Sequence, residues 1–236
     1  MGGPQQHRVL PVSNTREETR ATYDRIARFY DLVEGRWERN ARLTGIRALA
    51  LRPGEHVVEI GFGTGEALVG LARLAGPRGS VEGVDLSPNM VTKARNRVGA
   101  ALLDAEVSLR TGDALALPYE GGQFDAAFTS FMLELLADDE IPAALAEVLR
   151  VLHPGGRLCV VALSRAGEDT LLRRLYEWGH VHFPHVLDCR PIYVAESLED
   201  AGFEGIRPLR TRLWGLPIET VVGYRPTAHR APTVAS

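Results

Sequence analysis

A glycine-rich turn is the first feature of this sequence that could do chemistry. The apolar run 56–60 leads into the sequence EIGFGTG at residues 59–65. Glycine allows positive φ and a close approach of the backbone to a ligand, and the N-terminus of a following helix offers N–H groups to an anion. The spacing is G-x-G-x-G, whereas a dinucleotide fingerprint has its third glycine where this chain has Glu66. The turn predicts a bound small molecule, with an ordinary structural turn as the alternative.

Two aspartates follow the next two apolar runs and could bind a nucleoside. Asp85 ends the run 80–85, and a carboxylate at the end of such a strand can accept hydrogen bonds from both hydroxyls of a ribose. The alternative is a solvated aspartate or a cap for the next helix, a role that Ser87 can already fill. Asp113, within Gly112-Asp113-Ala114, could accept from an adenine amino group, although a Gly-Asp pair is also an ordinary turn.

The elements that must position these residues alternate between strands and helices. Apolar runs bounded by glycine or proline predict strands at 56–60, 80–85, 107–109, 124–129 and 157–163, and a final hairpin of 205–213 with 219–224. Helices are expected at 66–74, from Pro88 onward, at 141–152, at 169–179 and at 192–201. Parallel strands with right-handed crossovers place ligands outside the carboxyl ends of the strands.

The chain before the glycine turn contains two further helical stretches, 16–33 and 38–51. We expect them to stay outside the sheet and to form a helical lid, residues 15–51, over the ligand crevice. The whole chain, 1–236, is then one domain. Its other parts are a cofactor-binding core at 53–164, substrate-side helices and the terminal hairpin at 165–225, and a loose tail at 226–236.

Composition narrows the classes of function. The 236 residues are 45% apolar and 24% charged, which suffices for one sizeable core. A formal net charge of −3 argues against binding to a nucleic-acid backbone. We expect neither a membrane span nor a secretory signal, because no apolar run is long enough. Two cysteines, Cys159 and Cys189, are too few for a disulfide framework, which favours a cytoplasmic location.

Together these motifs resemble the class I S-adenosylmethionine-dependent methyltransferases. The resemblance runs in register from Pro53 to Leu163, with matching motifs at 57–65, 84–87, 112–114, 124–130 and 147–157. It implies an α/β fold, a Rossmann-like doubly wound sheet of seven mostly parallel strands with an antiparallel last strand. The nearest type is the menaquinone/ubiquinone-biosynthesis C-methyltransferase, whose N-terminal Y-D…Y-D segment is similar to residues 23–31 here. This chain departs from that type at residues 131–134, which read FMLE in place of an asparagine-bearing signature.

The resemblance also implies a cofactor, S-adenosylmethionine, and roles for particular residues. Glu59 and the glycines would surround its methionine end, Asp85 would hold the ribose, and Leu86 and Met90 would pack near the adenine. The residues implied to line the cofactor site are Tyr30, Glu59, Gly61, Phe62, Gly63, Gly65, Asp85, Leu86, Met90, Gly112, Asp113, Ala114, Thr129 and Ser130. Those expected to contact the acceptor are Tyr23, Phe131, His182 and His185.

Methyl transfer from a sulfonium depends mostly on holding the acceptor and the methyl group in line in a dry site. An acceptor hydroxyl or amine also needs a base. The candidates are Tyr30, from the lid, and His182, from the sequence HVHFPH at 180–185, and the sequence names no catalytic residue beyond these. The same histidines could bind a metal with Cys189, but no ligand spacing fits, and we predict no metal.

Arginines recur every three residues around Trp37, at Arg36, Arg39 and Arg42. This pattern predicts either contact with an anionic lipid or acidic substrate, or a solvated helix face paired with glutamates. His153, in the turn before the strand 157–163, is expected to be structural.

The sequence thus predicts a methyltransferase that acts on a small, apolar or aromatic acceptor, quinone-, phenol- or lipid-like. Nucleic acid is not expected as a partner, and peripheral membrane contact is compatible with the pattern. One alternative is an NAD(P)-dependent oxidoreductase, which would require a different glycine spacing and gives no reason for Asp113. Another is a non-catalytic module that binds S-adenosylmethionine. The acceptor, the atom that is methylated and the oligomeric state are left open.

Overall fold

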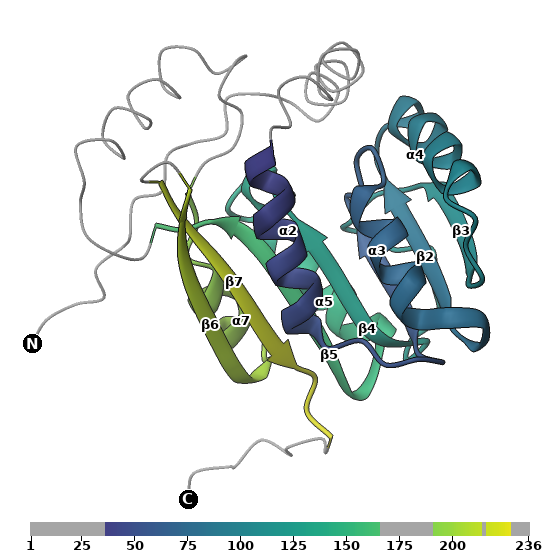
Figure 1. The fold of residues 1–236 in the computed structure, drawn as a ribbon. Helices are drawn as coiled ribbons and strands as arrows, with labels where there is room; N and C mark the ends of the chain where they lie inside the picture. The colour runs from purple at the N-terminus through teal and green to yellow at the C-terminus, as the bar shows by residue number, and fades with distance from the viewer. Residues whose placement is uncertain (1–35, 166–190, 214–215, 228–236) are drawn as a thin grey trace, which may run out of the picture.

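A seven-stranded sheet forms the centre of the computed structural model, which describes residues 36–165, 191–213 and 216–227 (Figure 1). The strands are β1 His56–Ile60, β2 Ser80–Asp85, β3 Glu106–Thr111, β4 Phe124–Ser130, β5 Leu152–Leu163, β6 Glu204–Leu213 and β7 Leu216–Tyr224. Their order is β3-β2-β1-β4-β5-β7-β6. Strands β1 to β5 pair in parallel, whereas β7 is antiparallel to both β5 and β6. The predicted Rossmann-like sheet, with its terminal hairpin, is confirmed.

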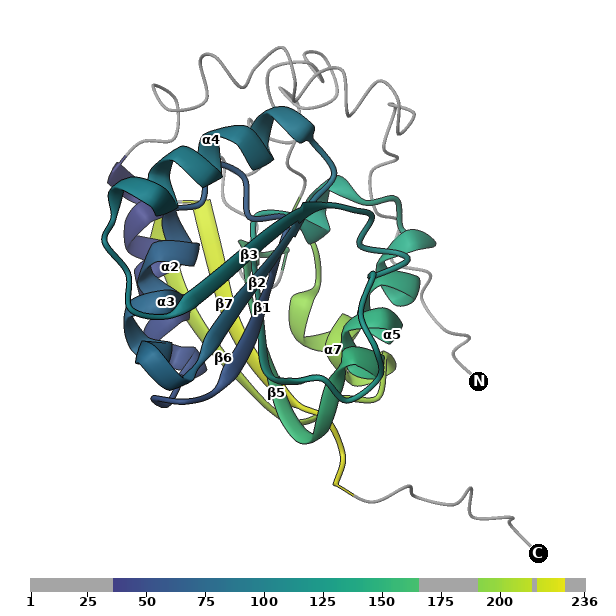
Figure 2. The same ribbon diagram turned by 90° about the vertical axis from the view of Figure 1, so that its right-hand side faces the viewer.

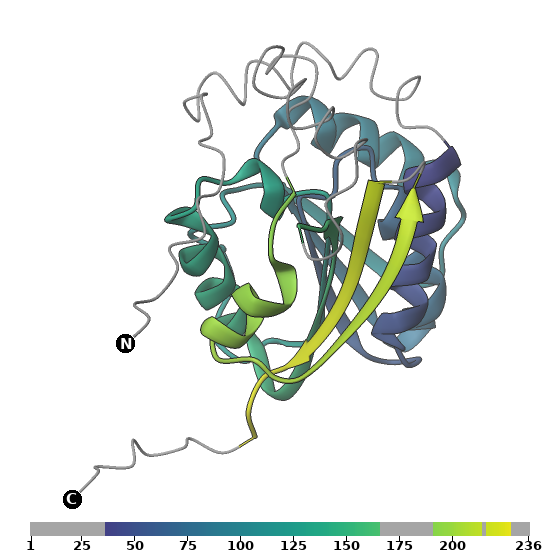
Figure 3. The ribbon, with the colours of Figure 1, turned by 90° about the vertical axis from the view of Figure 1, so that its left-hand side faces the viewer.

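Helices cover both faces of this sheet. They are α2 Arg36–Leu49, α3 Glu66–Ala75, α4 Pro88–Ala100, α5 Glu140–Val151 and α7 Val194–Asp200, with short 3-10 turns η1 Gly76–Arg78 and η2 Leu133–Leu135. Helices α2, α3 and α4 lie on one face, and α5 and α7 lie on the other (Figure 2). Figure 3 views the sheet from the edge formed by β6 and β7, with α2 on one side and α7 on the other.

The central strand β1 shows why the sequence folds in this way. Successive side chains of a strand point to opposite faces, and here Val57 packs in the layer under α2 and α3 while Val58 packs in the layer under α5. Both are fully buried. A parallel strand with helices on both faces therefore reads as a nearly continuous apolar run; Val57, Val58 and Ile60 fit this pattern, and Glu59 is the one charged residue within it.

Helix α2 corresponds to the second half of the predicted lid, and the structure places it elsewhere. It packs along the sheet face against β4, β5 and β7. The contact is closest at Gly45, where an added Cβ would lie 2.3 Å from Cγ2 of Val161. The Cys159 thiol donates a hydrogen bond to the Gly45 carbonyl oxygen at 3.3 Å. Because glycine removes the side chain at this point, residues 36–49 cover the sheet instead of closing over the strand ends, and residues 15–35 of the predicted lid lie outside the described residues.

Several other boundaries differ from the predictions, among them the starts of β5 and α7. Strand β5 begins at Leu152, five residues earlier than expected, because a bulge at Gly155, with a φ of 81°, lets the chain pair with β4 on both sides of the turn. Helix α7 begins at Val194, since Ile192 still pairs with Ser164 in a short parallel bridge. The predicted helix 169–179 lies outside the described residues. No helix in the described part of the chain has both the length and the hydrophobicity to cross a bilayer.

Candidate functional site

The candidate site lies where the carboxyl ends of β1, β2 and β4 meet. Strand β1 pairs with β2 on one side and β4 on the other, so that Glu59 lies level with Gly83 and Phe128. In the sheet, β2 and β3 lie on one side of β1, and β4 and β5 lie on the other. The direction in which successive strands are added to the sheet therefore reverses at β1. Ligands of open α/β sheets bind at such a switch point. The topology therefore brings the glycine turn, Asp85 and the end of β4 to one edge.

The glycine turn has the backbone that its sequence requires. Gly61, Gly63 and Gly65 all have positive φ, at 70°, 53° and 83°. An added Cβ would lie 2.4 Å from Met132 at Gly61 and 2.8 Å from Ala94 at Gly65, so both positions need close packing as well. At Gly63, however, an added Cβ would meet no atom within 4 Å. The middle glycine thus faces open space, where a ligand can approach the backbone.

Asp85 is oriented by two backbone N–H groups. Its Oδ2 accepts from the Gly63 nitrogen at 2.8 Å, and its Oδ1 accepts from the Ser87 nitrogen at 2.9 Å. Ser87 caps the next helix by accepting from the Met90 nitrogen, as expected, so the helix cap does not depend on Asp85. The half-buried carboxylate joins β2 to the open glycine, and each carboxylate oxygen can accept more than one hydrogen bond.

The loop after β3 lies next to Asp85. The Gly112 nitrogen donates to the Asp85 carbonyl oxygen at 3.0 Å, and an added Cβ on Gly112 would lie 2.9 Å from Val84. The Asp113 side chain accepts from the Leu115 nitrogen at 2.9 Å, which is the pattern of an aspartate turn. Asp113 and Ala114 are each half-buried beside the site, so one Asp113 oxygen has a local structural role in addition to any ligand contact.

The end of β4 carries unusual polar and backbone features. The Thr129 hydroxyl oxygen is buried and has no hydrogen-bond partner among the described residues. Ser130 accepts a hydrogen bond from Nε of Arg42 at 3.4 Å. Phe131 adopts a φ of 55°, and its nitrogen still donates to the Val161 carbonyl oxygen. Positive φ in an aromatic residue costs about 1–3 kcal/mol and is commonly retained at functional sites.

Buried carboxylates border the same edge. Glu59 is only 1% exposed, two residues before Gly61. Glu134 is completely buried, and its Oε1 accepts from the Leu163 nitrogen at 3.2 Å, which ties the turn after β4 to the end of β5. The sequence reasoning did not single out Glu134. The sequence does contain a signal for Glu134: it is the one acidic residue in the apolar run 131–136, and such a residue indicates a buried carboxylate with a specific partner.

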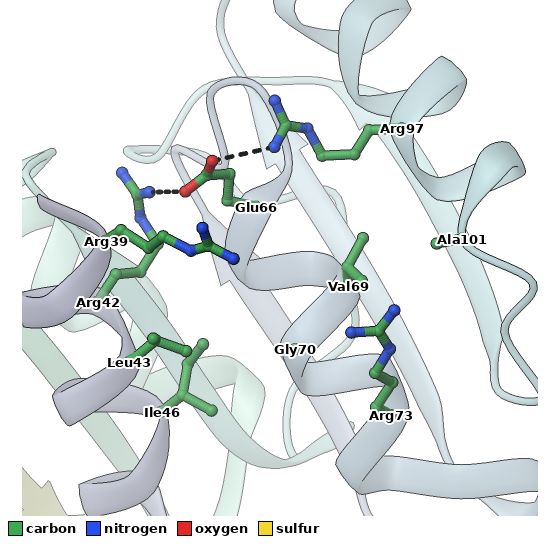
Figure 4. A pocket seen from close by; sticks show the side chains of 10 residues that line it. All are labelled: Arg39, Arg42, Leu43, Ile46, Glu66, Val69, Gly70, Arg73, Arg97 and Ala101. Carbon is green, nitrogen blue, oxygen red and sulfur yellow. Dashed lines mark hydrogen bonds and ion pairs between the residues drawn. The ribbon is translucent and has the colours of Figure 1, made fainter. Parts of the chain in front are cut away.

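Glu66 stands where a dinucleotide fingerprint would have glycine, and its environment explains how the carboxylate is tolerated. It accepts from Arg42 of α2 at 2.7 Å and from Arg97 of α4 at 3.1 Å (Figure 4). Arg42 is only 8% exposed and also pairs with Glu38 at 3.5 Å. Arg42 therefore does not lie on a solvated helix face, and the three helices α2, α3 and α4 are joined next to the glycine turn.

The two residues expected near the adenine have different environments. Leu86 is 38% exposed at the end of β2, in a position to contact a ligand. Met90 is only 2% exposed and is one of the buried residues of α4. Phe62 is also buried, at 4% exposed, and packs with the layer that contains α3. Met90 and Phe62 are thus packing residues next to the site in this structure, and neither side chain is exposed to a ligand.

The described residues fit S-adenosylmethionine. The cofactor carries a cationic sulfur, an amino-acid end and a ribose diol. Open space at Gly63 leaves room for it, the oriented Asp85 carboxylate suits the diol, and the buried Glu59 carboxylate suits a cation.

Several predicted residues cannot be placed. Tyr23, Tyr30, His182 and His185 lie outside the described residues, as does Cys189. Within the described ranges, no group of three or more histidine, cysteine, aspartate or glutamate side chains could hold a metal ion. The histidine-rich segment lies outside those ranges, and the prediction of no metal stays a prediction.

Comparison with solved structures identifies the fold. The structure is similar to a S-adenosylmethionine-dependent methyltransferase from Aquifex aeolicus, with a TM-score of 0.58 and 21% identity over 78% of this chain and 89% of that one. It is also similar to the cyclase SpnF, with a TM-score of 0.71 and 19% identity over 94% of this chain and 100% of that one. Because one of these proteins is titled a cyclase, likeness of fold does not by itself define the reaction.

Sequence comparison identifies the family. Residues 57–156 match the model of a methyltransferase domain. The chain is 32% identical to a 2-phytyl-1,4-naphtoquinone methyltransferase from Trichormus variabilis, over 68% of this chain and 71% of the relative. It is 33% identical to a demethylmenaquinone methyltransferase from Symbiobacterium thermophilum, over 62% of this chain and 59% of that relative's length.

The chain therefore belongs to the S-adenosylmethionine-dependent methyltransferases, and S-adenosylmethionine is its cofactor. Within that class, relatives named as quinone-biosynthesis methyltransferases are among those that the chain is similar to, in agreement with its motifs.

Proposed function

We propose that this chain methylates a small aromatic acceptor of the quinone or phenol kind, at the carboxyl ends of β1, β2 and β4. The observation that carries the proposal is the oriented Asp85 carboxylate beside the open Gly63 turn. The named relatives support the acceptor class, since two of them act on naphthoquinones according to their names. The apolar residues that follow β4, Phe131 and Met132, also favour an aromatic acceptor.

The described residues have distinct roles toward the cofactor in this proposal. Asp85 accepts hydrogen bonds from the ribose hydroxyls, and the Gly63 turn lets the backbone contact the methionine end. Glu59 places a buried negative charge near the cationic groups. Leu86 and the 112–114 loop enclose the adenine. S-adenosylmethionine, when bound, supplies a methyl group on a positively charged sulfur.

The turn after β4 orients the acceptor. Phe131 is 8% exposed, and Met132 packs against Gly61, so an apolar wall borders the glycine turn on the acceptor side. Such a wall excludes water and holds a flat ring in line with the methyl group. Orientation of this kind can lower a barrier by about 7–11 kcal/mol.

A hydroxylated ring becomes a better nucleophile when its hydroxyl loses a proton. The two described histidines that the structure fixes by hydrogen bonds, His56 and His153, lie at the amino ends of β1 and β5, far from this turn. They are therefore not the base. Tyr30 and His182 remain the proposed candidates.

Two measurements test the proposal. Isothermal titration with S-adenosylmethionine and, separately, with NADH is expected to show binding of the first alone. Incubation with methyl-labelled cofactor and a panel of acceptors (a naphthoquinol without a ring methyl, a catechol and an aliphatic amine) is expected to label an aromatic product. Mass spectrometry of that product then shows whether carbon or oxygen carries the methyl group.

Each alternative has its own outcome. Binding of NADH in place of S-adenosylmethionine would support an oxidoreductase. Binding of S-adenosylmethionine without label transfer to any aromatic acceptor would contradict the proposed substrate class and favour a non-catalytic module.

A further inference from the structure

A second hollow lies on the helical face of the sheet. It is a groove of about 240 Å³ between α2, α3 and the end of α4 (Figure 4). Its lining residues are Arg39, Arg42, Leu43, Ile46, Glu66, Val69, Gly70, Arg73, Arg97 and Ala101. Four of them are arginines and one is a glutamate, so the groove carries a formal charge of +3 in a chain whose net charge is −3.

The arginines of the groove fall into two pairs. Arg42 and Arg97 are bound to Glu66 and join the helices. Arg39 and Arg73 are exposed and make no hydrogen bond or ion pair with any other described residue. In Figure 4 the Arg39 guanidinium extends from α2 toward α3, and the Arg73 guanidinium points along α3 toward Val69. Two cations that no described residue pairs with thus extend from opposite walls into one groove.

The rest of the lining is apolar. Leu43 and Ile46 line it from α2 and Val69 lines it from α3; Leu43 is 38% exposed, whereas Ile46 is only 5% exposed. Ala101 closes the α4 side, and the next residue, Leu102, is 94% exposed. Apolar surface with a guanidinium rim is complementary to a molecule that has an anionic head and a hydrocarbon chain.

We propose that this groove binds an amphipathic anion, a single lipid-like molecule whose one phosphate group lies between Arg39 and Arg73 and whose aliphatic chain lies on Leu43, Ile46 and Val69. A phosphate has enough oxygens to accept hydrogen bonds from two guanidinium groups at once, and arginine suits such recognition. A free inorganic anion would leave the apolar floor exposed to water. None of the residues that line this groove is among those implied to line the cofactor site, and binding here does not depend on the identity of the methyl acceptor.

The test uses the full chain and three probes, namely decyl phosphate below its aggregation concentration, inorganic phosphate and decanol. Titration calorimetry compares the natural chain with Arg39→Gln/Arg73→Gln. The matched control is Arg47→Gln/Arg78→Gln, which removes the same charge from exposed arginines of α2 and η1 that do not line the groove. Circular dichroism checks that each variant is folded, and Arg73→Gln alone serves if the double variant is not.

The natural chain is expected to bind decyl phosphate at least tenfold more tightly than either inorganic phosphate or decanol. Loss of charge-assisted hydrogen bonds is expected to weaken binding by about tenfold or more in Arg39→Gln/Arg73→Gln, with no more than about twofold change in the control. Equal weakening in both double variants, or equal affinity for inorganic phosphate and decyl phosphate, would overturn the proposal. So would binding to vesicles of an anionic phospholipid without binding to decyl phosphate, because that result describes a membrane surface and not a groove.

Discussion

The two ends of the central strands carry polar groups of different kinds. At the amino ends, charged side chains bond to one another and to neighbouring backbone. Nε2 of His153 lies 2.9 Å from Oδ1 of Asp125, and Oδ2 of Asp125 accepts from the backbone nitrogen of His56 at 2.7 Å. Arg157 pairs with Glu55 at 2.6 Å. These contacts link the strands and the end of α2, so this end contributes to stability.

At the carboxyl ends the polar groups lie at the edge of the sheet that carries the open glycine turn. The Asp85 carboxylate is held by backbone N–H groups, the Thr129 hydroxyl oxygen is buried without a hydrogen bond to any described residue, and Phe131 has a strained backbone. Strain and an unsatisfied polar atom lower stability, and they persist where the surrounding fold enforces them. Substitutions at the amino ends of the strands should therefore change the stability of the fold, and those at the carboxyl ends should change ligand binding.

The largest expected effect is at the amino end. The Arg157 guanidinium donates to Glu55 and to the carbonyl oxygens of Leu49 and Ala50. Arg157→Met leaves a mostly buried carboxylate and two carbonyls without this donor and is expected to lower the free energy of unfolding by about 2–4 kcal/mol. Urea denaturation measures it, with exposed Arg52→Met as the control. Loss of S-adenosylmethionine affinity in a folded Arg157→Met protein would contradict the comparison.

At the other end, Asp85→Ala is expected to weaken S-adenosylmethionine binding by about 1.5–3 kcal/mol, because hydrogen bonds to a charged group are lost. Titration calorimetry measures the dissociation constant. Asp125→Ala is the matched control, since it removes a strand-end carboxylate of the amino side. An unchanged affinity in folded Asp85→Ala would refute the ribose role.

Substitutions at two glycines with similar backbone conformation can distinguish an effect on stability from an effect on cofactor binding. Gly63 and Gly122 have φ of 53° and 72°, and an added Cβ would contact nothing closer than 3.9 Å at either position. Both alanine variants are expected to lose about 1–2 kcal/mol of stability, the cost of left-handed backbone. Only Gly63→Ala is expected to weaken cofactor binding, because its methyl group enters the open space. Equal affinities in the two variants would show that this space is not the cofactor site.

The smallest effect concerns pH. Burial alone would raise the pKa of Asp125, but hydrogen bonds from His56 and His153 hold it below its ordinary value of 3.8. The Pro154 carbonyl and then Asp125 raise the pKa of His153 above 6.5. The stabilisation from Asp125 is therefore lost as pH falls below about 4, and that from His153 is lost as pH rises above about 6.5.

Because the pair is partly exposed, we expect only about 0.5 kcal/mol from it. Urea denaturation at pH 5.5 and 8.5 should show that the natural chain loses about this much more than His153→Gln. The same pH dependence in both proteins would assign the effect to other groups.

Most of the fold could be predicted from local sequence. Strand β1 and the glycine turn were predictable because a doubly buried strand and a positive-φ turn each require particular residues at adjacent positions. The position of α2 was not predictable, since its approach to the sheet depends on Gly45 meeting Val161, which is far away in the sequence.

The candidate site was predictable only in part. Asp85 and the glycines occupy the predicted edge because strand order places them there. The pairing of Glu66 with Arg42 and Arg97 joins residues 24 and 31 positions apart, and no local pattern specifies such contacts. The same holds for Glu134 and the Leu163 nitrogen, 29 positions apart.

The central claim is that the cofactor lies at the carboxyl ends of β1 and β2. A crystal structure of the chain with S-adenosylhomocysteine tests it most directly. We expect both ribose hydroxyls within about 3 Å of the Asp85 carboxylate and the amino-acid end against the turn 61–65. Electron density for the nucleoside in the groove between α2 and α3, or side chains of this protein filling the space beside Gly63, would contradict the account.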